Sequence, residues 1–306
     1  MTERSKALFA LIVCILLWGV SFVSTKIAGT VFPPMSLGAI RFALASAVLV
    51  FIKSRSALRE ELKAGDLPLL IGAGLTGVTL YFFFENTGLG LISASEASII
   101  VASIPALTLA AEWLGGKFAP LGKKRGEAPA SGGAPPRIRG RRWLGALISM
   151  IGVALTAHGS APLPGGGNVL GYLCMAGAAL SWVAYCFLSR PLFGRRSRIY
   201  IVFWQTVFGF LAFIPFAIIE FPRWGSPDLV SAVHTAFLGI FCSALAYRFY
   251  AQSLAVLGIP LSALFLNFVP VVTVVAGFFM LGEHLNPVQW AGAALVLAGV
   301  YLAMKE

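Results

Sequence analysis

Two segments, LWGVSFVSTK (17–26) and LSWVAYCFLSR (180–190), decide the fold because they are two versions of one pattern. Aligning Trp18 with Trp182 places Lys26 on Arg190, at an offset of 164 residues. The same offset places Arg41 on Gln205 in the segment that follows. Tryptophan and a terminal cation recur in the same order, which predicts an internal repeat.

Further matches extend the repeat over the chain. Tyr81-Phe-Phe-Phe aligns with Tyr247-Arg-Phe-Tyr, Ile104-Pro105-Ala106 with Val269-Pro270-Val271, and Trp143 with Trp290 at a shorter offset of 147. We therefore divide the chain into a first unit over 5–159 and a second over 168–304. Each unit is expected to hold five membrane spans, and an odd number makes the second unit enter from the opposite side. The prediction is an all-α integral membrane protein of ten helices in two inverted repeats.

Composition supports a membrane protein. Of the 306 residues, 58% are hydrophobic and only 11% are charged, whereas soluble domains average about 25% charged residues. A helix needs roughly 20 apolar residues to cross a bilayer. The expected spans are 7–28, 36–53, 67–89, 92–115, 142–159, 168–189, 199–219, 229–253, 259–281 and 287–304.

The basic residues predict the orientation. With both termini in the cytoplasm and alternating helices, all basic residues except Lys26, Arg41, Arg223 and Arg248 fall in cytoplasmic segments or at their edges. Cytoplasmic loops carry such an excess of lysine and arginine. The net charge of +11 therefore indicates a multi-pass protein of the inner or plasma membrane rather than a nucleic-acid binder. The Gly-, Pro- and Arg-rich segment 117–142 is expected to be a flexible cytoplasmic linker.

Other function classes lack their motifs. The four cysteines form no CxxC pair or metal spacing, so we expect neither a metal nor a cofactor. The chain has no phosphate-binding GxxxxGK[ST] loop, no HExxH and no serine nucleophile with a histidine base in a known motif. An intramembrane enzyme is thus the least favoured reading, and a membrane receptor would be expected to have an extramembrane domain.

The sequence resembles the drug/metabolite transporter superfamily, in particular its ten-helix EamA members such as the YddG-like amino-acid exporters. The resemblance rests on LWGVSF around Trp18, Arg41-Phe42, the Ser93-Ala-Ser to Pro105 stretch, Trp204-Gln205, Pro270, Leu281-Gly-Glu and the Gly292 to Gly299 helix. It implies export of amino acids, related metabolites or drugs. Two departures stand out: the first unit has Leu114-Gly-Gly-Lys in place of Leu-Gly-Glu, and Glu85 replaces a more usual apolar residue.

Candidate cavity residues come from both units. Binding sites of inverted-repeat transporters lie near the midplane between the halves, and aromatic walls suit apolar solutes or an ammonium group. Ordinary core packing is the alternative for any single aromatic residue. The residues expected to line the cavity are Trp18, Tyr81, Glu85, Trp182, Tyr185, Tyr247, Arg248 and Asn267.

Charged residues inside the spans predict gates. The outer side of the cavity is expected to hold Lys26, Arg41, Glu85 and Glu96, and the inner side Glu112 and Arg248. Ion pairs within each group would close the cavity on that side, and the two gates would alternate. Snorkelling to the interface is the alternative for Lys26 and Glu112. Glu85 or Glu96 is a candidate carrier of a coupling proton. Pro105 and Pro270, both mid-helix, are candidate hinges.

The sequence therefore predicts a secondary transporter of small metabolites that exports amino acids or related amphipathic solutes by alternating access. The expected partners are a small-molecule substrate, the lipid bilayer and protons. Drug or cation efflux and transport of an organic anion such as a nucleotide sugar remain open, the latter because Lys26, Arg41 and Arg248 offer positive charge.

Overall fold

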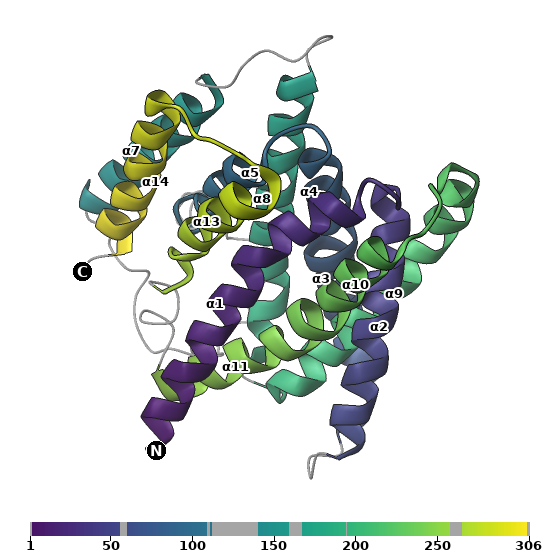
Figure 1. The fold of residues 1–306 in the computed structure, drawn as a ribbon. Helices are drawn as coiled ribbons and strands as arrows, with labels where there is room; N and C mark the ends of the chain where they lie inside the picture. The colour runs from purple at the N-terminus through teal and green to yellow at the C-terminus, as the bar shows by residue number, and fades with distance from the viewer. Residues whose placement is uncertain are drawn as a thin grey trace.

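The protein is described here from a computed structural model that covers residues 2–55, 60–108, 111, 140–158, 167–193, 195–257 and 265–304. Helices dominate this part of the chain, and it contains no β-strand (Figure 1). The elements of the first half are α1 (Glu3–Ala28), α2 (Pro34–Ser54), η1 (Ala64–Asp66), α3 (Leu67–Gly74), η2 (Leu75–Leu80), α4 (Tyr81–Leu89), α5 (Ala94–Val101) and α7 (Gly140–His158). Those of the second half are α8 (Gly167–Phe193), α9 (Arg198–Glu220), η4 (Phe221–Arg223), α10 (Leu229–Ala236), η5 (Phe237–Leu245), α11 (Ala246–Leu257), α13 (Val269–Leu281) and α14 (Pro287–Met304).

The helices have the length and surface of membrane spans. Within the described residues, six are long and apolar enough to cross a bilayer: Glu3–Ala28, Pro34–Ser54, Ala64–Leu89, Asn168–Leu192, Arg198–Arg223 and Leu229–Tyr250. Four shorter apolar helices accompany them: Ala94–Thr108, Trp143–His158, Val269–Leu281 and Pro287–Leu302. Large apolar side chains also point outward, with Ile219 73% and Phe279 79% exposed. Lipid, unlike water, is a favourable environment for such a surface.

The packing between the two halves is reciprocal. Helix α1 packs against α11 and α13, while α8 packs against α4 and α5. Helices α2 and α9 pack against each other, and α2 also contacts η5 just as α9 contacts η2. The starts of α2 and α9 carry the spacing of the sequence repeat, since Pro34 and Arg198 are 164 residues apart.

Helices α7 and α14 form a pair that lies to one side of the bundle (Figure 1). Glycine allows their backbones to approach closely. A Cβ atom on Gly299 would clash with the backbone of Ser149, and one on Gly292 would clash with Thr156. Small residues at such contacts are typical of helix association in membranes.

Two irregularities recur in both halves. Helix geometry widens to π-helix in η2, which ends directly before Tyr81, and in η5, which ends two positions before Tyr247. Helical geometry is also interrupted ahead of each predicted hinge proline. Ser103 N donates to Ile100 O, and Phe268 N donates to Phe265 O, so each hydrogen bond spans three residues instead of the four of an α-helix. Ser103 lies two positions before Pro105, and Phe268 lies two positions before Pro270. The prolines thus lie in the first turn of a resumed helix, where the missing N–H is tolerated.

Candidate functional site

Two tryptophans pack against tyrosines of the opposite half, one edge-on and one tilted. The Trp18 ring in α1 lies 5.3 Å from the Tyr247 ring of α11, and the Trp182 ring in α8 lies 5.1 Å from the Tyr81 ring of α4. The alignment that pairs Trp18 with Trp182 also pairs Tyr247 with Tyr81, so the two contacts are equivalent. Trp182 further contacts Tyr185 at 5.0 Å. Aromatic pairs at these separations attract beyond their buried area.

The π-helix η5 orients one of these tryptophans. Trp18 Nε1 donates to the carbonyl oxygen of Cys242 at 3.0 Å, and Cys242 Sγ in turn donates to Leu17 O at 3.3 Å. π-helical turns are frequent at functional sites because they redirect backbone groups. The indole of Trp18 is therefore fixed against the second half of the molecule by a backbone acceptor.

A carboxylate and a guanidinium are buried beside the aromatic pairs. Tyr81 donates its hydroxyl to Glu85 Oε1 at 2.9 Å. Arg41, on α2, is 2% exposed, lies over the Phe82 ring at 4.2 Å and donates from Nε to Ser243 Oγ at 2.6 Å. Burial of ionisable groups at membrane depth is a default indicator of function.

These residues form one neighbourhood. The Tyr247 hydroxyl lies within electrostatic reach of Tyr185, Arg41 and Glu85. We call the set the central cluster, and its members are Trp18, Arg41, Tyr81, Glu85, Trp182, Tyr185 and Tyr247. The structure thus brings together six residues predicted to line the cavity, and it adds Arg41, which was predicted to form a gate.

Other predicted residues lie elsewhere. Arg248 is exposed on α11, whose contacts with Trp18 come from Tyr247 and Tyr250, and its place in the cavity stays a prediction. Asn267 is half-buried in the turn before α13. Glu112 and the linker residues 117–139 lie outside the described residues.

The predicted outer cluster divides into two. Arg41 and Glu85 belong to the central cluster, whereas Lys26 and Glu96 lie at the N-terminus of α5. Lys26 Nζ donates to Ile92 O at 2.6 Å and pairs with Glu283 Oε1 at 3.6 Å. Glu96 accepts from Ser93, from the Tyr172 hydroxyl at 2.9 Å and from Gln289 Nε2 at 2.8 Å.

Glu283 also belongs to this second group, although it was not among the predicted site residues. Glu283 accepts hydrogen bonds from Ala94 N, Ser95 N and Ser95 Oγ, at 2.8, 3.0 and 2.8 Å, so it caps α5 from the other half of the chain. We call Lys26, Ser95, Glu96, Tyr172, Glu283 and Gln289 the α5 network. A carboxylate at a helix N-terminus is favoured by the unpaired N–H groups and the helix dipole.

Two glycines make room for Glu283. Gly282 has φ +66°, the only positive φ in the described chain, and it turns the backbone back so that Glu283 N donates to Gly277 O. A Cβ atom on Gly277 would lie 2.8 Å from Glu283 Oε2. The Leu-Gly-Glu motif was visible in the sequence, but its partners are backbone groups of a distant helix.

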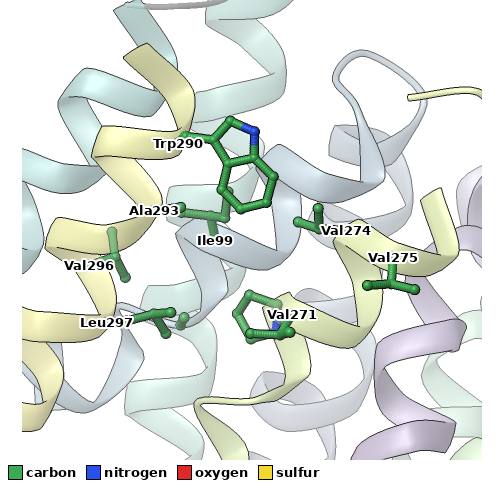
Figure 2. Close-up of a pocket in the computed structure, with 10 residues that line it drawn as sticks. Ile99, Val271, Val274, Val275, Trp290, Ala293, Val296 and Leu297 are labelled. Carbon is green, nitrogen blue, oxygen red and sulfur yellow. The ribbon is translucent and has the colours of Figure 1, made fainter. Parts of the chain in front are cut away.

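Two hollows lie outside both groups. One of about 90 Å³ lies between α5, α13 and α14, where Ile99, Pro270, Val271, Trp290 and Val296 form an apolar wall (Figure 2). A groove of about 390 Å³ follows α2 and α9 between Ala39, Ile40, Phe210 and Ile214. Within the part of the chain that the structure describes, no cluster of histidine, cysteine or acidic residues could hold a metal.

Comparison with known proteins identifies the family. The model of the EamA-like transporter family matches residues 5–119 and 169–305, which is most of the chain. The chain belongs to this family. It is therefore a membrane transporter rather than an enzyme, and its matched ranges include the central cluster and the α5 network.

Curated relatives of this EamA protein match over nearly their whole length. An uncharacterized transporter of Archaeoglobus fulgidus is 25% identical over 94% of this chain and 95% of its own. A probable terminal-alkyne amino-acid exporter of Streptantibioticus cattleyicolor is 26% identical, covering 99% and 95%. A probable amino-acid metabolite efflux pump of Escherichia coli K12 is 25% identical, covering 98% and 95%. One crystal structure with 22% identity aligns at a TM-score of 0.65 over 99% of both chains, and it supports the fold alone.

Proposed function

We propose that this transporter exports amino acids or related amphipathic solutes by alternating access. The observation that carries the proposal is the pair of equivalent Trp–Tyr contacts, 18 with 247 and 182 with 81, beside a buried carboxylate. An amphipathic solute needs aromatic walls for its apolar part and a polar group for its ammonium. Two of the relatives carry names that refer to amino-acid export, which supports the same substrate class.

The proposed architecture is ten helices in two inverted five-helix repeats, over 5–159 and 168–304. Six long and four shorter apolar helices are compatible with this number. Reciprocal packing of α1 with α11 and of α8 with α4 supports the repeat, as do the paired interruptions ahead of Pro105 and Pro270. Interrupted helices in corresponding positions are typical of transporters whose site lies between the halves. We place both termini in the cytoplasm and the protein in the inner membrane, following the basic residues.

The α5 network is the proposed outer gate. It joins α1 and α5 of the first half to the segment between α13 and α14 and to α8 of the second half. Under the proposed topology, the end of α1 and the start of α5 face the outside. Release of a solute there requires Lys26 and Ser95 to separate from Glu283. The interruptions at Pro105 and Pro270 are the proposed hinges, and Glu85 or Glu96 is the proposed proton carrier.

The test is transport by the purified protein in proteoliposomes. Vesicles receive a mixed pool of labelled amino acids, with and without an imposed pH gradient, and vesicles without protein give the background. Protein-dependent movement of amino acids is the expected result. Glu85→Gln keeps the size of the side chain but cannot carry the proton. If transport by wild type depends on the pH gradient and transport by this variant does not, the coupling proton is assigned to Glu85.

Other outcomes separate the alternatives. Movement of apolar cations but not of amino acids would contradict the proposed substrate and favour drug efflux, with Glu85 as the acceptor of positive charge. Movement of anionic metabolites alone would favour an organic-anion carrier. Movement of amino acids without any gradient dependence would remove the proton carrier and leave a facilitator.

A further inference from the structure

Arg41 is buried, but the described residues leave part of its hydrogen-bonding capacity and its charge unpaired. Arginine keeps its proton and its positive charge in proteins. Arg41 is nonetheless 2% exposed, and among the described residues it has no ion-pair partner. Its Nη1 atom is fully buried and finds no hydrogen-bond partner there either. Buried charges in proteins are normally paired, so this side chain requires an explanation.

Its surroundings hold the guanidinium in place without neutralising it. Ser243 Oγ accepts from Nε at 2.6 Å, and the Phe82 ring lies 4.2 Å from the guanidinium carbon. Gly239 lets the second half approach, because a Cβ atom there would lie 2.8 Å from the carbonyl oxygen of Arg41. The guanidinium is thus oriented by contacts that supply no negative charge.

The nearby carboxylate does not serve as the partner. Glu85 lies within electrostatic reach of Arg41, yet the two form no ion pair, and Glu85 Oε1 accepts from the Tyr81 hydroxyl instead. An oriented guanidinium with a free N–H group matches the geometry of a carboxylate, which it binds through parallel hydrogen bonds. Phosphate groups are bound in the same way, and it is the proposed amino-acid substrate that makes a carboxylate the matching partner.

We infer that Arg41 binds the carboxylate of the transported solute. The inference rests on the proposed export of amino acids and names the group by which the solute is held. Arg41 then acts as a substrate-binding residue rather than a gate, and Ser243 acts as the residue that positions it. The proximity of Arg41 to the reciprocal Trp–Tyr contacts places the side chain of the bound solute against the aromatic walls.

The experiment compares solutes that differ only at the carboxyl group. Proteoliposomes that carry a labelled amino acid are challenged with the unlabelled amino acid, its amide and the amine that lacks the carboxyl carbon. Wild type is expected to prefer the acid over the amide by about tenfold or more, the scale of a hydrogen bond to a charged group. Arg41→Gln is expected to abolish this preference and to raise KM more than it lowers kcat.

Three variants sharpen the comparison. Arg41→Lys keeps the charge but loses the paired donors, so an intermediate acid/amide ratio is expected. Ser243→Ala is expected to raise KM severalfold while keeping the ratio above one. Arg223→Gln removes an exposed arginine in η4 and is expected to match wild type. A purely structural Arg41 would lower activity for acid and amide alike and leave their ratio unchanged.

The outcomes distinguish the two claims. An acid/amide ratio that survives in Arg41→Gln overturns the inference. If that variant fails to fold, equal competition by acid and amide in wild type overturns it as well. Transport of carboxylates other than amino acids would contradict the proposed substrate but support Arg41, whereas transport of only solutes without a carboxylate would contradict the role of Arg41.

Discussion

The α5 network and the central cluster both hold charged side chains between the two halves, but they differ in how fully these side chains are paired. In the α5 network Glu283 accepts three hydrogen bonds and an ion pair, and Glu96 accepts from three residues. In the central cluster Arg41 keeps a buried donor without a partner. The paired carboxylates of the α5 network stabilise the contact between the two halves, whereas the unpaired donor of Arg41 is available to a ligand.

This difference in pairing predicts that changes in the two groups affect different properties of the protein. A buried polar group without a partner costs about 1–3 kcal/mol, and a protein retains such a group where function requires it. Changes in the α5 network are therefore expected to act mainly on stability and on opening of the outer side. Changes in the central cluster are expected to act mainly on affinity for the solute.

The largest effect is expected for Glu283→Ala. This change leaves two backbone N–H groups of α5 and Ser95 Oγ without their acceptor and removes the ion-pair partner of Lys26, which keeps its hydrogen bond to Ile92 O, and it should lower stability by about 3 kcal/mol. A fall of the apparent melting temperature in detergent measures it. Glu3→Gln is the matched control, because the Lys6–Glu3 pair is solvent-exposed and worth little. Equal melting temperatures for Glu283→Ala and wild type would show that the network does not hold the halves together.

A smaller effect is expected for Gly277→Ala. The added Cβ atom would lie 2.8 Å from Glu283 Oε2 and 3.0 Å from Ser95 Oγ, and displacing the carboxylate should cost about 1–2 kcal/mol. Gly65→Ala serves as the control, since nothing lies within 4 Å of a Cβ atom there. The same melting assay applies, and a neutral Gly277→Ala would mean that Glu283 relocates without loss.

The smallest effect distinguishes the two reciprocal contacts. Tyr81→Phe removes the hydroxyl that donates to Glu85 and keeps the ring against Trp182, so we expect a loss of about 1 kcal/mol and a severalfold rise in KM. Tyr247→Phe should affect stability less, because the Tyr247 hydroxyl makes no hydrogen bond to the residues that the structure describes. Identical losses in the two variants would contradict a special role for the Tyr81–Glu85 bond.

Much of the fold was predictable from local sequence, and less of the site. Apolar length marks the helices, and the shared pattern around Trp18 and Trp182 identifies two residues that occupy equivalent contacts. The π-helices η2 and η5 had no sequence signal, because their geometry follows from packing between helices. The exposure of Arg248 depends on which face of α11 meets α1, which spacing along one helix does not determine.

The contacts of Glu283 were also not predictable from the sequence. Its donors are backbone N–H groups of Ala94 and Ser95, and every residue type except proline presents the same group. The identity of the donors therefore leaves no trace in the sequence. Arg41 was visible as a buried cation, but only the contacts of its neighbours show that Glu85 is engaged with Tyr81 and leaves the guanidinium unpaired.

Reversible cross-linking of the α5 network tests the central claim, that this network opens in each transport cycle, most directly. Lys26→Cys and Glu283→Cys are combined in a protein whose four native cysteines are replaced, and joined by a short thiol cross-linker in proteoliposomes. Each single-cysteine variant receives the same reagent as a control. The account predicts that transport stops on cross-linking of the pair and returns to its starting rate on cleavage of the linker. Unchanged transport by fully cross-linked protein would contradict it.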